Sequence, residues 1–202
     1  MSQEMPFVPG ATTIGIVCKD GVLLASERRL SYGYFVMSKT AKKVFKLTDM
    51  IGAACAGLMG DMQILIREAV AYTNLYSYER GRIASVRTAA KVMGTLLFER
   101  RLFPYLTQTI VAGIDEEGPS LFVLDPIGSV IQDKYASVGT GAEIAVGVLE
   151  AEYKDGLTVE QAKELVGKAF KAALARDSAS GEGVDLLVII KDGAREESLK
   201  LA

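Results

Sequence analysis

The order of strand-like and helix-like segments constrains the fold of this chain more than any other feature of its sequence. Short runs rich in β-branched and aromatic residues come first and two segments with helical spacing follow. More strands, two further helices and an almost wholly apolar strand at residues 184–190 complete the order. Runs of strands separated by pairs of helices predict packed antiparallel sheets covered by helices, which is an α+β fold.

The predicted strands are short and bounded by turn residues, and the predicted helices begin or end at Gly, Ser or Thr. We predict strands at residues 12–18, 22–25, 35–37, 44–47, 51–56, 106–114, 120–124, around 130, and at 135–138 and 184–190. We predict helices at residues 59–80, 85–101, 142–153 and 158–176. The residues after 190 are predicted to form a short polar tail.

The apolar content is high for a protein that works alone. Hydrophobic residues make up 50% of the 202 residues and the mean hydropathy is +0.23. No window reaches the roughly 18 uninterrupted apolar residues of a membrane span, so we expect the excess to be buried against partner chains and expect no contact with a membrane. The net charge of −2 predicts no nucleic-acid partner.

Several kinds of site are excluded by what the chain lacks. It has two cysteines, Cys18 and Cys55, which form neither a disulfide framework nor a metal-type cluster, and we expect no metal and no cofactor. Residues 1–10 lack the pattern of a signal peptide, so we expect a cytoplasmic protein. The chain contains no histidine, which rules out Ser-His-Asp and Cys-His catalysis and any zinc site with a His ligand.

Thr12 and Thr13, at the start of the first strand, are candidates for a different chemistry. A threonine hydroxyl can use its own α-amino group as the base, because that amine has a pKa of about 7.7–8. This arrangement requires removal of the residues that precede the threonine. Strand threonines without a catalytic role are the commoner interpretation when nothing else supports the chemistry.

Further polar residues accompany these threonines. Asp177 and Ser180 lie in a tight loop between a helix and a buried strand, Glu27 follows an apolar strand, and Lys43 opens another. Taken singly, each has an ordinary explanation as a turn former or a solvated strand end.

Together, these residues form a set of motifs that resembles archaeal proteasome β-type subunits, which are N-terminal threonine hydrolases. The motifs are Gly10-x-Thr12-Thr13-Ile14-Gly15-Ile16, Glu27-Arg28-Arg29, Lys42-Lys43, Ala56-Gly57-Leu58-x-Gly60-Asp61, Phe103-Pro104-Tyr105, Gly113-Ile114-Asp115 with residues 116–119, and Arg176-Asp177-Ser178-Ala179-Ser180-Gly181. The resemblance runs from residue 10 to about 190. Residues 26–33 and 124–129 particularly resemble a second β type of some crenarchaea.

The resemblance implies a four-layer α-β-β-α sandwich of two antiparallel sheets, the N-terminal nucleophile hydrolase fold. Residues 1–11 would be a leader, cut after Gly10 or Ala11, and residues 12–202 a single domain. The chain would assemble with proteasome α subunits and other β subunits into stacked seven-membered rings. A regulatory ATPase would bind through the α ring, and unfolded polypeptides would be the substrates.

The resemblance also assigns roles to individual residues. The charge of Lys43 would lower the pKa of groups around the nucleophile, and Glu27 would pair with Lys43. The N–H of Gly57 would form the oxyanion hole. The N-terminal amine would be held by Asp177 and Ser180, with Thr140 keeping a hydroxyl where the family usually has serine. An apolar specificity pocket, selecting hydrophobic residues, would be lined by Leu30, Ala41, Phe45, Cys55 and Met59.

The sequence departs from the family at Ala11, which stands where catalytic subunits have the nucleophilic threonine. One explanation is cleavage between Ala11 and Thr12, with Thr12 as the nucleophile; strand alternation opposes it, because Thr12 would face away from the site unless a bulge intervenes. A second is a noncatalytic β subunit, and a third is an engineered Thr→Ala change.

Other functional classes also fit parts of the pattern. A self-sufficient threonine peptidase and the simpler bacterial relative with one subunit type share the threonine start. The loop at residues 176–181 and the turn at 115–119 favour a proteasomal β chain over the bacterial relative.

Overall fold

The computed structural model of the chain describes residues 10–200, and it contains two antiparallel five-stranded sheets that lie face to face. One, the β1 sheet, has the strand order β10-β1-β2-β11-β12, and the other, the β6 sheet, has the order β5-β6-β7-β8-β9. The strands are β1 (Thr12–Val17), β2 (Gly21–Glu27), β3 (Leu30–Tyr32), β4 (Phe35–Ser38), β5 (Val44–Lys46), β6 (Ile51–Gly57), β7 (Thr107–Asp115), β8 (Gly118–Leu124), β9 (Val130–Asp133), β10 (Tyr135–Gly139), β11 (Val184–Ile190) and β12 (Gly193–Leu199).

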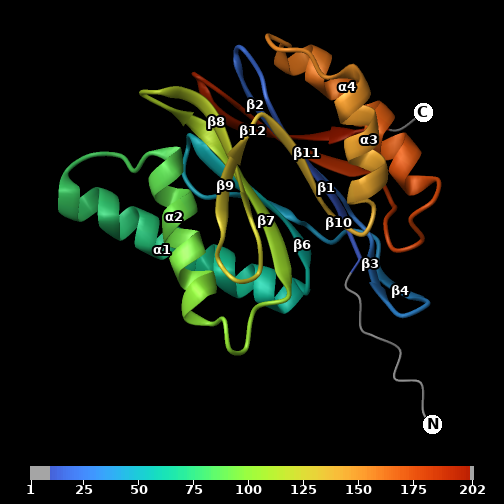
Figure 1. The fold of residues 1–202 in the computed structure, drawn as a ribbon, viewed down its shortest axis with the longest axis horizontal. Helices are drawn as coiled ribbons and strands as arrows, with labels where there is room; N and C mark the ends of the chain where they lie inside the picture. The colour runs from blue at the N-terminus through green and yellow to red at the C-terminus, as the bar shows by residue number, and fades with distance from the viewer. Residues whose placement is uncertain (1–9, 201–202) are drawn as a thin grey trace.

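Two pairs of helices cover the outer faces of the sheets. The helices are α1 (Met59–Arg80), α2 (Val86–Glu99), α3 (Ala142–Glu152) and α4 (Val159–Leu174). The Ser85 side chain caps α2 by accepting a hydrogen bond from the Thr88 N–H, and Thr158 and Gln161 form a capping box at α4. Figure 1 shows α1 and α2 on one side, the two sheets in the middle, and α3 and α4 on the other side.

Three apolar clusters hold these layers together. One lies between the β6 sheet and α1–α2, a second between the β1 sheet and α3–α4, and a third between the two sheets. Strand β1 contributes to two of them, because Ile14 and Ile16 face α3–α4 while Val17 packs against the cluster between the sheets, to which Ala11, just before β1, also belongs. The predicted four-layer α-β-β-α sandwich is confirmed.

The predicted polar tail is wrong. Residues Gly193–Leu199 form β12, which pairs along its whole length with β11 at the edge of the β1 sheet. The segment is polar because an edge strand faces solvent, and its charged side chains at Arg195, Glu196 and Glu197 are typical of an edge that must not pair with another chain. Tertiary pairing therefore formed a strand where the local composition indicated none.

A second difference concerns the region after β2. Strands β3 and β4 form a small separate two-stranded sheet, and only β4 was predicted.

The proposed leader, residues 1–11, lies outside the described residues except for Gly10 and Ala11. None of the helices in residues 10–200 has the length and apolar character needed to span a membrane.

Strand register brings distant residues together at one end of the β1 sheet. Thr12 lies opposite Gly139, Thr13 lies opposite Ser26, and Glu27 lies opposite Val184. Because the strands are antiparallel, the start of β1, the end of β2, the end of β10 and the start of β11 meet there. The candidate site is at this end.

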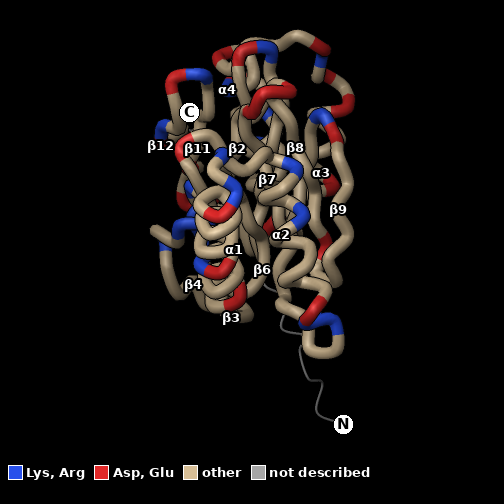
Figure 2. The backbone as a smooth tube through the Cα atoms, turned by 90° about the vertical axis from the view of Figure 1, so that its left-hand side faces the viewer, with Lys and Arg blue, Asp and Glu red and all other residues tan. Residues whose placement is uncertain are grey.

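Figure 2 shows that acidic and basic residues are mixed along the side of the molecule that it views.

Candidate active site

The residues at the start of β1 point alternately toward the second sheet and toward the helix layer. Ala11 is fully buried in the cluster between the sheets, with Ala54 and Ala56 of β6. Thr13 also faces the second sheet, since its hydroxyl donates to the Cys55 carbonyl at 3.1 Å. Thr12, between them, is fully buried on the opposite side.

Thr12 ends a chain of hydroxyl groups that leads to Asp177. The Ser180 hydroxyl donates to Asp177 Oδ2 at 2.6 Å, and the Thr12 and Ser180 hydroxyl oxygens lie 2.8 Å apart. Since the single proton of Ser180 goes to the carboxylate, Thr12 is the donor to Ser180. The Thr12 hydroxyl is thus engaged in a buried hydrogen bond on the face away from the β6 sheet.

Thr140 makes a second connection to the same carboxylate. Its hydroxyl donates to Asp177 Oδ2 at 2.6 Å and accepts a hydrogen bond from the Ala11 N–H at 3.2 Å. Asp177 therefore links the main chain at Ala11 to the Thr12 side chain through two hydroxyl groups. The structure thus brings Asp177, Ser180 and Thr140 together at the start of β1.

Glycines leave room for this close packing. A Cβ atom on Gly141 would lie 2.1 Å from Thr12 Oγ1, and a Cβ atom on Gly139 would lie 2.1 Å from the Ala11 carbonyl oxygen. A Cβ atom on Gly10 would lie 2.0 Å from Cβ of Ala179. The chain at Gly10 and Ala11 therefore passes between the end of β10 and the loop at Ala179, with no room for a side chain at any of these three glycines.

Lys43 and Glu27 form an ion pair that joins the two sheets. Glu27 ends β2, and the carbonyl of Lys43 accepts the N–H of Cys55 in β6. The two side chains are 1% and 0% exposed, and the Lys43 ammonium donates to Glu27 Oε1. Burial lowers the pKa of Lys43 and raises the pKa of Glu27, while their mutual attraction opposes both changes.

Two neighbours that sequence reasoning did not assign complete this pair. The Arg29 carbonyl accepts from the Lys43 ammonium at 2.5 Å. Glu27 Oε2 accepts the main-chain N–H of Arg29 at 2.6 Å and that of Gly181 at 3.0 Å. Arg29 and Gly181 lie inside the quoted motifs, but these contacts use main-chain atoms, which the sequence does not distinguish. Asp177 makes no direct hydrogen bond to Lys43 but is near enough for its charge to raise the pKa of the lysine.

Gly57 lies at the end of β6, immediately after Ala56. Its φ is 144°, and a Cβ atom there would lie 2.0 Å from the Leu106 carbonyl oxygen, so no other residue fits. Ala56, the residue before Gly57, shares the cluster between the sheets with Ala11, so β6 ends beside the start of β1.

The residues predicted to line an apolar pocket are spread over several elements. Leu30 is in β3, and Ala41 lies beside Arg28, because its N–H donates to the Arg28 carbonyl. Cys55 and Phe45 instead belong to the core beneath α1 and α2, and Met59 begins α1. Burial raises the pKa of the Cys55 thiol to about 12, so this sulfur is unreactive at neutral pH.

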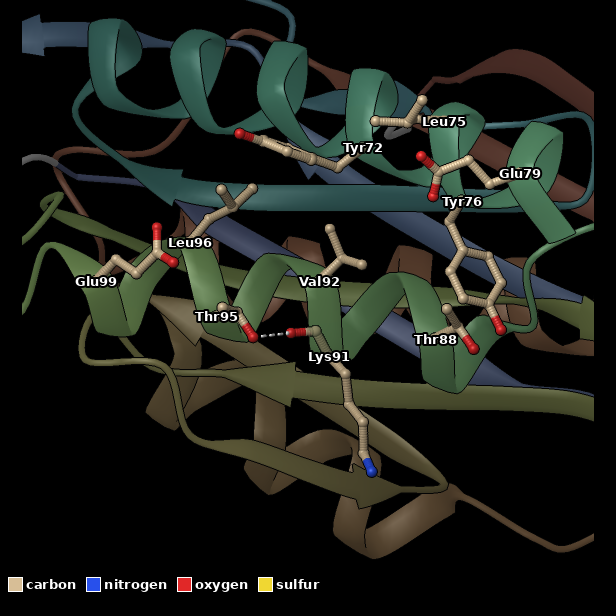
Figure 3. A pocket seen from close by; sticks show the side chains of 10 residues that line it. All are labelled: Tyr72, Leu75, Tyr76, Glu79, Thr88, Lys91, Val92, Thr95, Leu96 and Glu99. Atoms are coloured by element: carbon tan, nitrogen blue, oxygen red, sulfur yellow. Dashed lines mark hydrogen bonds between the residues drawn. The ribbon is translucent and has the colours of Figure 1, made fainter.

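The structure also contains a hollow of about 490 Å³ between α1 and α2, lined by none of the predicted site residues. Figure 3 shows its walls, which carry apolar, tyrosine and acidic side chains. The lining residues are Tyr72, Leu75, Tyr76, Glu79, Thr88, Lys91, Val92, Thr95, Leu96 and Glu99.

Among residues 10–200, His, Cys, Asp and Glu form no group able to hold a metal ion.

Comparison with known proteins identifies the family. The sequence model of a family described as "Proteasome subunit" matches residues 8–189. "Proteasome subunit beta 2" of Caldivirga maquilingensis is 47% identical over 201 residues, which cover 100% of both chains. "Proteasome subunit beta 1" of Nitrosopumilus maritimus is 49% identical over 94% of this chain and 96% of its own length. "Proteasome subunit beta 1" of Ignicoccus hospitalis is 50% identical over 90% of this chain and 91% of its own.

The chain therefore belongs to the proteasome subunit family. The resemblance to archaeal β-type subunits is confirmed, and membership implies a peptidase complex assembled with other proteasome subunits.

Proposed function

We propose that this chain is a noncatalytic β subunit of a proteasome core particle, which contributes a complete ring position but no nucleophile of its own. The observation that carries the proposal is the direction of the first side chains of β1. Ala11, a methyl group, faces the second sheet with Ala56, whereas the hydroxyl of the next residue, Thr12, faces Ser180 on the other side. A nucleophile must reach both its base and the carbonyl it attacks, and neither residue does so.

The alternative, an active endopeptidase that uses Thr12, receives less support. Thr12 is paired in register with Gly139 and Thr13 with Ser26, so the ladder continues without a shift at the start of the strand. A bulge there would be needed to turn Thr12 toward Lys43. The Thr12 hydroxyl is also fully buried and already bonded.

The other residues of the site are arranged as a threonine hydrolase would need them, and only the nucleophile at position 11 is missing. The Ala11 nitrogen lies 3.2 Å from the Thr140 hydroxyl, which is bonded to Asp177. If the chain were cut after Gly10, the new amine at position 11 would have these groups as partners. A threonine hydroxyl at position 11 would attack a peptide carbonyl, pass its proton to that amine, and leave the oxyanion facing the Gly57 N–H. Lys43 would supply positive charge.

Exposed apolar side chains support assembly with α subunits and other β subunits. Tyr34 is 93% exposed, Phe103 90%, Tyr78 88% and Leu102 82%. Contiguous apolar patches mark interaction sites, and Leu102 and Phe103 are neighbours in the chain. We propose that the particle is cytoplasmic, consists of stacked seven-membered rings, receives unfolded polypeptides from a regulatory ATPase on the α ring, and holds active β chains beside this one.

The decisive experiment compares the natural chain with the Ala11→Thr variant in particles that contain no other β subunit. The natural chain should keep residues 1–10, as measured by intact mass, and should hardly cleave fluorogenic peptides that end in a hydrophobic residue. Ala11→Thr should be cut after Gly10 and should raise the cleavage rate by several orders of magnitude, because a nucleophile and its base act as a unit.

The matched control is Thr12→Ala in both backgrounds, which should change neither processing nor the presence of activity. If the natural particles begin at Thr12 and lose activity with Thr12→Ala, the chain is a working protease and the proposal is wrong. Mixing the chain with its α subunit should give a barrel-sized particle on a sizing column.

A further inference from the structure

Glu182 is the one residue other than glycine with a positive φ in the described part of the chain, at 68°. It lies between Gly181 and Gly183 in the loop that carries Asp177 and Ser180. The left-handed conformation is unfavourable for a residue with a long side chain, and it persists only where contacts hold the residue in place. The contacts of Glu182 are therefore informative.

Both carboxylate oxygens of Glu182 are used, and each reaches a different segment. Oε1 accepts from the Arg29 guanidinium at 3.2 Å, and Oε2 lies 3.5 Å from the Lys39 ammonium. The side chains of Glu182 and Arg29 are 22% and 24% exposed, so this contact is partly shielded from solvent. Lys39 is mostly exposed and its contribution is smaller.

Arg29 extends the connection from Glu182 to the buried ion pair. Its guanidinium also donates to the Ser178 carbonyl at 2.8 Å, and it fills the space next to Gly181, where a Cβ atom would lie 2.4 Å from it. Its main-chain carbonyl and N–H bind Lys43 and Glu27. One residue thus touches both the loop of Asp177 and the pair of Lys43 with Glu27.

We propose that Glu182 is a positioning residue for the site. By holding Arg29 and Lys39, it fixes the distance between the loop that carries Asp177 and Ser180 and the segments that carry Glu27 and Lys43. The carboxylate itself touches none of the reacting atoms. This inference rests on the proposed function of the site, because its kinetic consequence is visible only when position 11 carries a nucleophile.

The test uses assembled particles of the Ala11→Thr variant, with Glu182→Gly and Glu182→Gln added. Glycine adopts a positive φ freely, so Glu182→Gly removes the contacts without adding strain. We expect kcat to fall by about tenfold to a hundredfold, with KM changed less than about twofold and an unchanged melting temperature, because misplacement of catalytic groups lowers the rate of the chemical step. Glu182→Gln keeps an acceptor for Arg29 and should retain most of kcat.

The control is Glu196→Gln, which breaks a surface pair with Lys42, the neighbour of Lys43. It should leave kcat and KM unchanged. If Glu182→Gly matches its parent in kcat, the positioning role is wrong. If Glu182→Gly fails to assemble, the Gln variant decides: kcat equal to that of Glu182 supports the acceptor role, and a loss as large as that caused by Lys43→Met contradicts it.

A second measurement does not depend on activity. In the natural chain with Ala11, the Gly181 amide donates to Glu27, so its hydrogen exchange reports how firmly the loop is held. Glu182→Gly should speed this exchange by about tenfold, and unchanged exchange would overturn the proposal. An inactive Ala11→Thr particle would count against the proposed function alone, and the exchange rate would still decide the role of Glu182.

Discussion

The polar groups on the two faces of β1, near the start of this strand, are of different kinds. Toward the second sheet, Lys43 and Glu27 form a buried ion pair that joins one sheet to the other. Toward α3 and α4, three hydroxyl groups and Asp177 form a network within one sheet and its loops. A broken ion pair leaves a buried charge, whereas a network that loses one hydroxyl keeps its remaining bonds. The first side should therefore be far more sensitive to substitution.

The largest effect is expected from Lys43→Met. Removal of the ammonium leaves Glu27 buried without its counter-charge, which costs about 3–5 kcal/mol. The double variant Lys43→Met with Glu27→Gln should regain most of this loss, because the amide oxygen still accepts the N–H groups of Arg29 and Gly181. Thermal unfolding of the single and double variants measures the loss of stability and its recovery. A double variant as unstable as the single one would contradict the comparison.

The same single variant should be sensitive to pH. Burial raises the pKa of Glu27 above its ordinary 4.5, and loss of Lys43 removes the main influence that lowers it. Glu27 would then bind a proton more readily in the folded than in the unfolded chain. The destabilisation by Lys43→Met should thus be smallest in acid and should grow as the pH rises through the raised pKa. Melting temperatures across a pH series check the sign.

A smaller effect is expected from Gly141→Ala on the other side of the strand. The added Cβ would lie 2.1 Å from Thr12 Oγ1 and 3.1 Å from Asp177 Oδ2, an overpacking that costs about 1–3 kcal/mol. Gly147→Ala in α3 is the matched control, since its Cβ would meet nothing within 4 Å and alanine favours a helix. If both glycines tolerate alanine equally in unfolding experiments, the packing around Thr12 is looser than described.

Thr12→Val should cost still less, about 1 kcal/mol. It keeps the shape of the side chain and removes one hydroxyl, while Ser180 and Thr140 keep their bonds to Asp177. Chemical denaturation of the particle measures the loss. A cost as large as that of Lys43→Met would show that the hydroxyl network is as critical as the ion pair.

The last and smallest expected effect is the reactivity of the two cysteine thiols in the folded chain. Burial raises the pKa of both thiols to about 12, so neither is a thiolate at about pH 8. A thiol reagent should react slowly with the native particle and rapidly after denaturation. Fast reaction of one thiol in the native state would show that its side of the molecule opens.

Most elements of the fold could be predicted from local patterns. The helix that begins at Met59 and ends at Arg80 was predicted with its observed bounds, because Gly81 marks its end. The bounds of β11, Val184–Ile190, also agree with the prediction, and most other boundaries differ by a few residues at most. The polar strand β12 was not predicted, because an edge strand made of polar residues lacks the alternation that marks a half-buried strand. Its pairing partner, β11, decides its conformation.

For the site, the sequence by itself determined the chemical inventory: no histidine, an alanine where a threonine nucleophile is expected, and a set of motifs that specifies the family. These are properties of residue types and their spacing, which a chain carries before it folds. The resemblance implied that Glu27 meets Lys43, and strand alternation implied that Thr12 faces away from the site. Tertiary structure alone decided that the partner of Thr12 is Ser180 and that Arg29 and Glu182 connect the two groups. Such contacts depend on strand register and on main-chain atoms, and every residue type supplies the same main-chain N–H and carbonyl apart from proline.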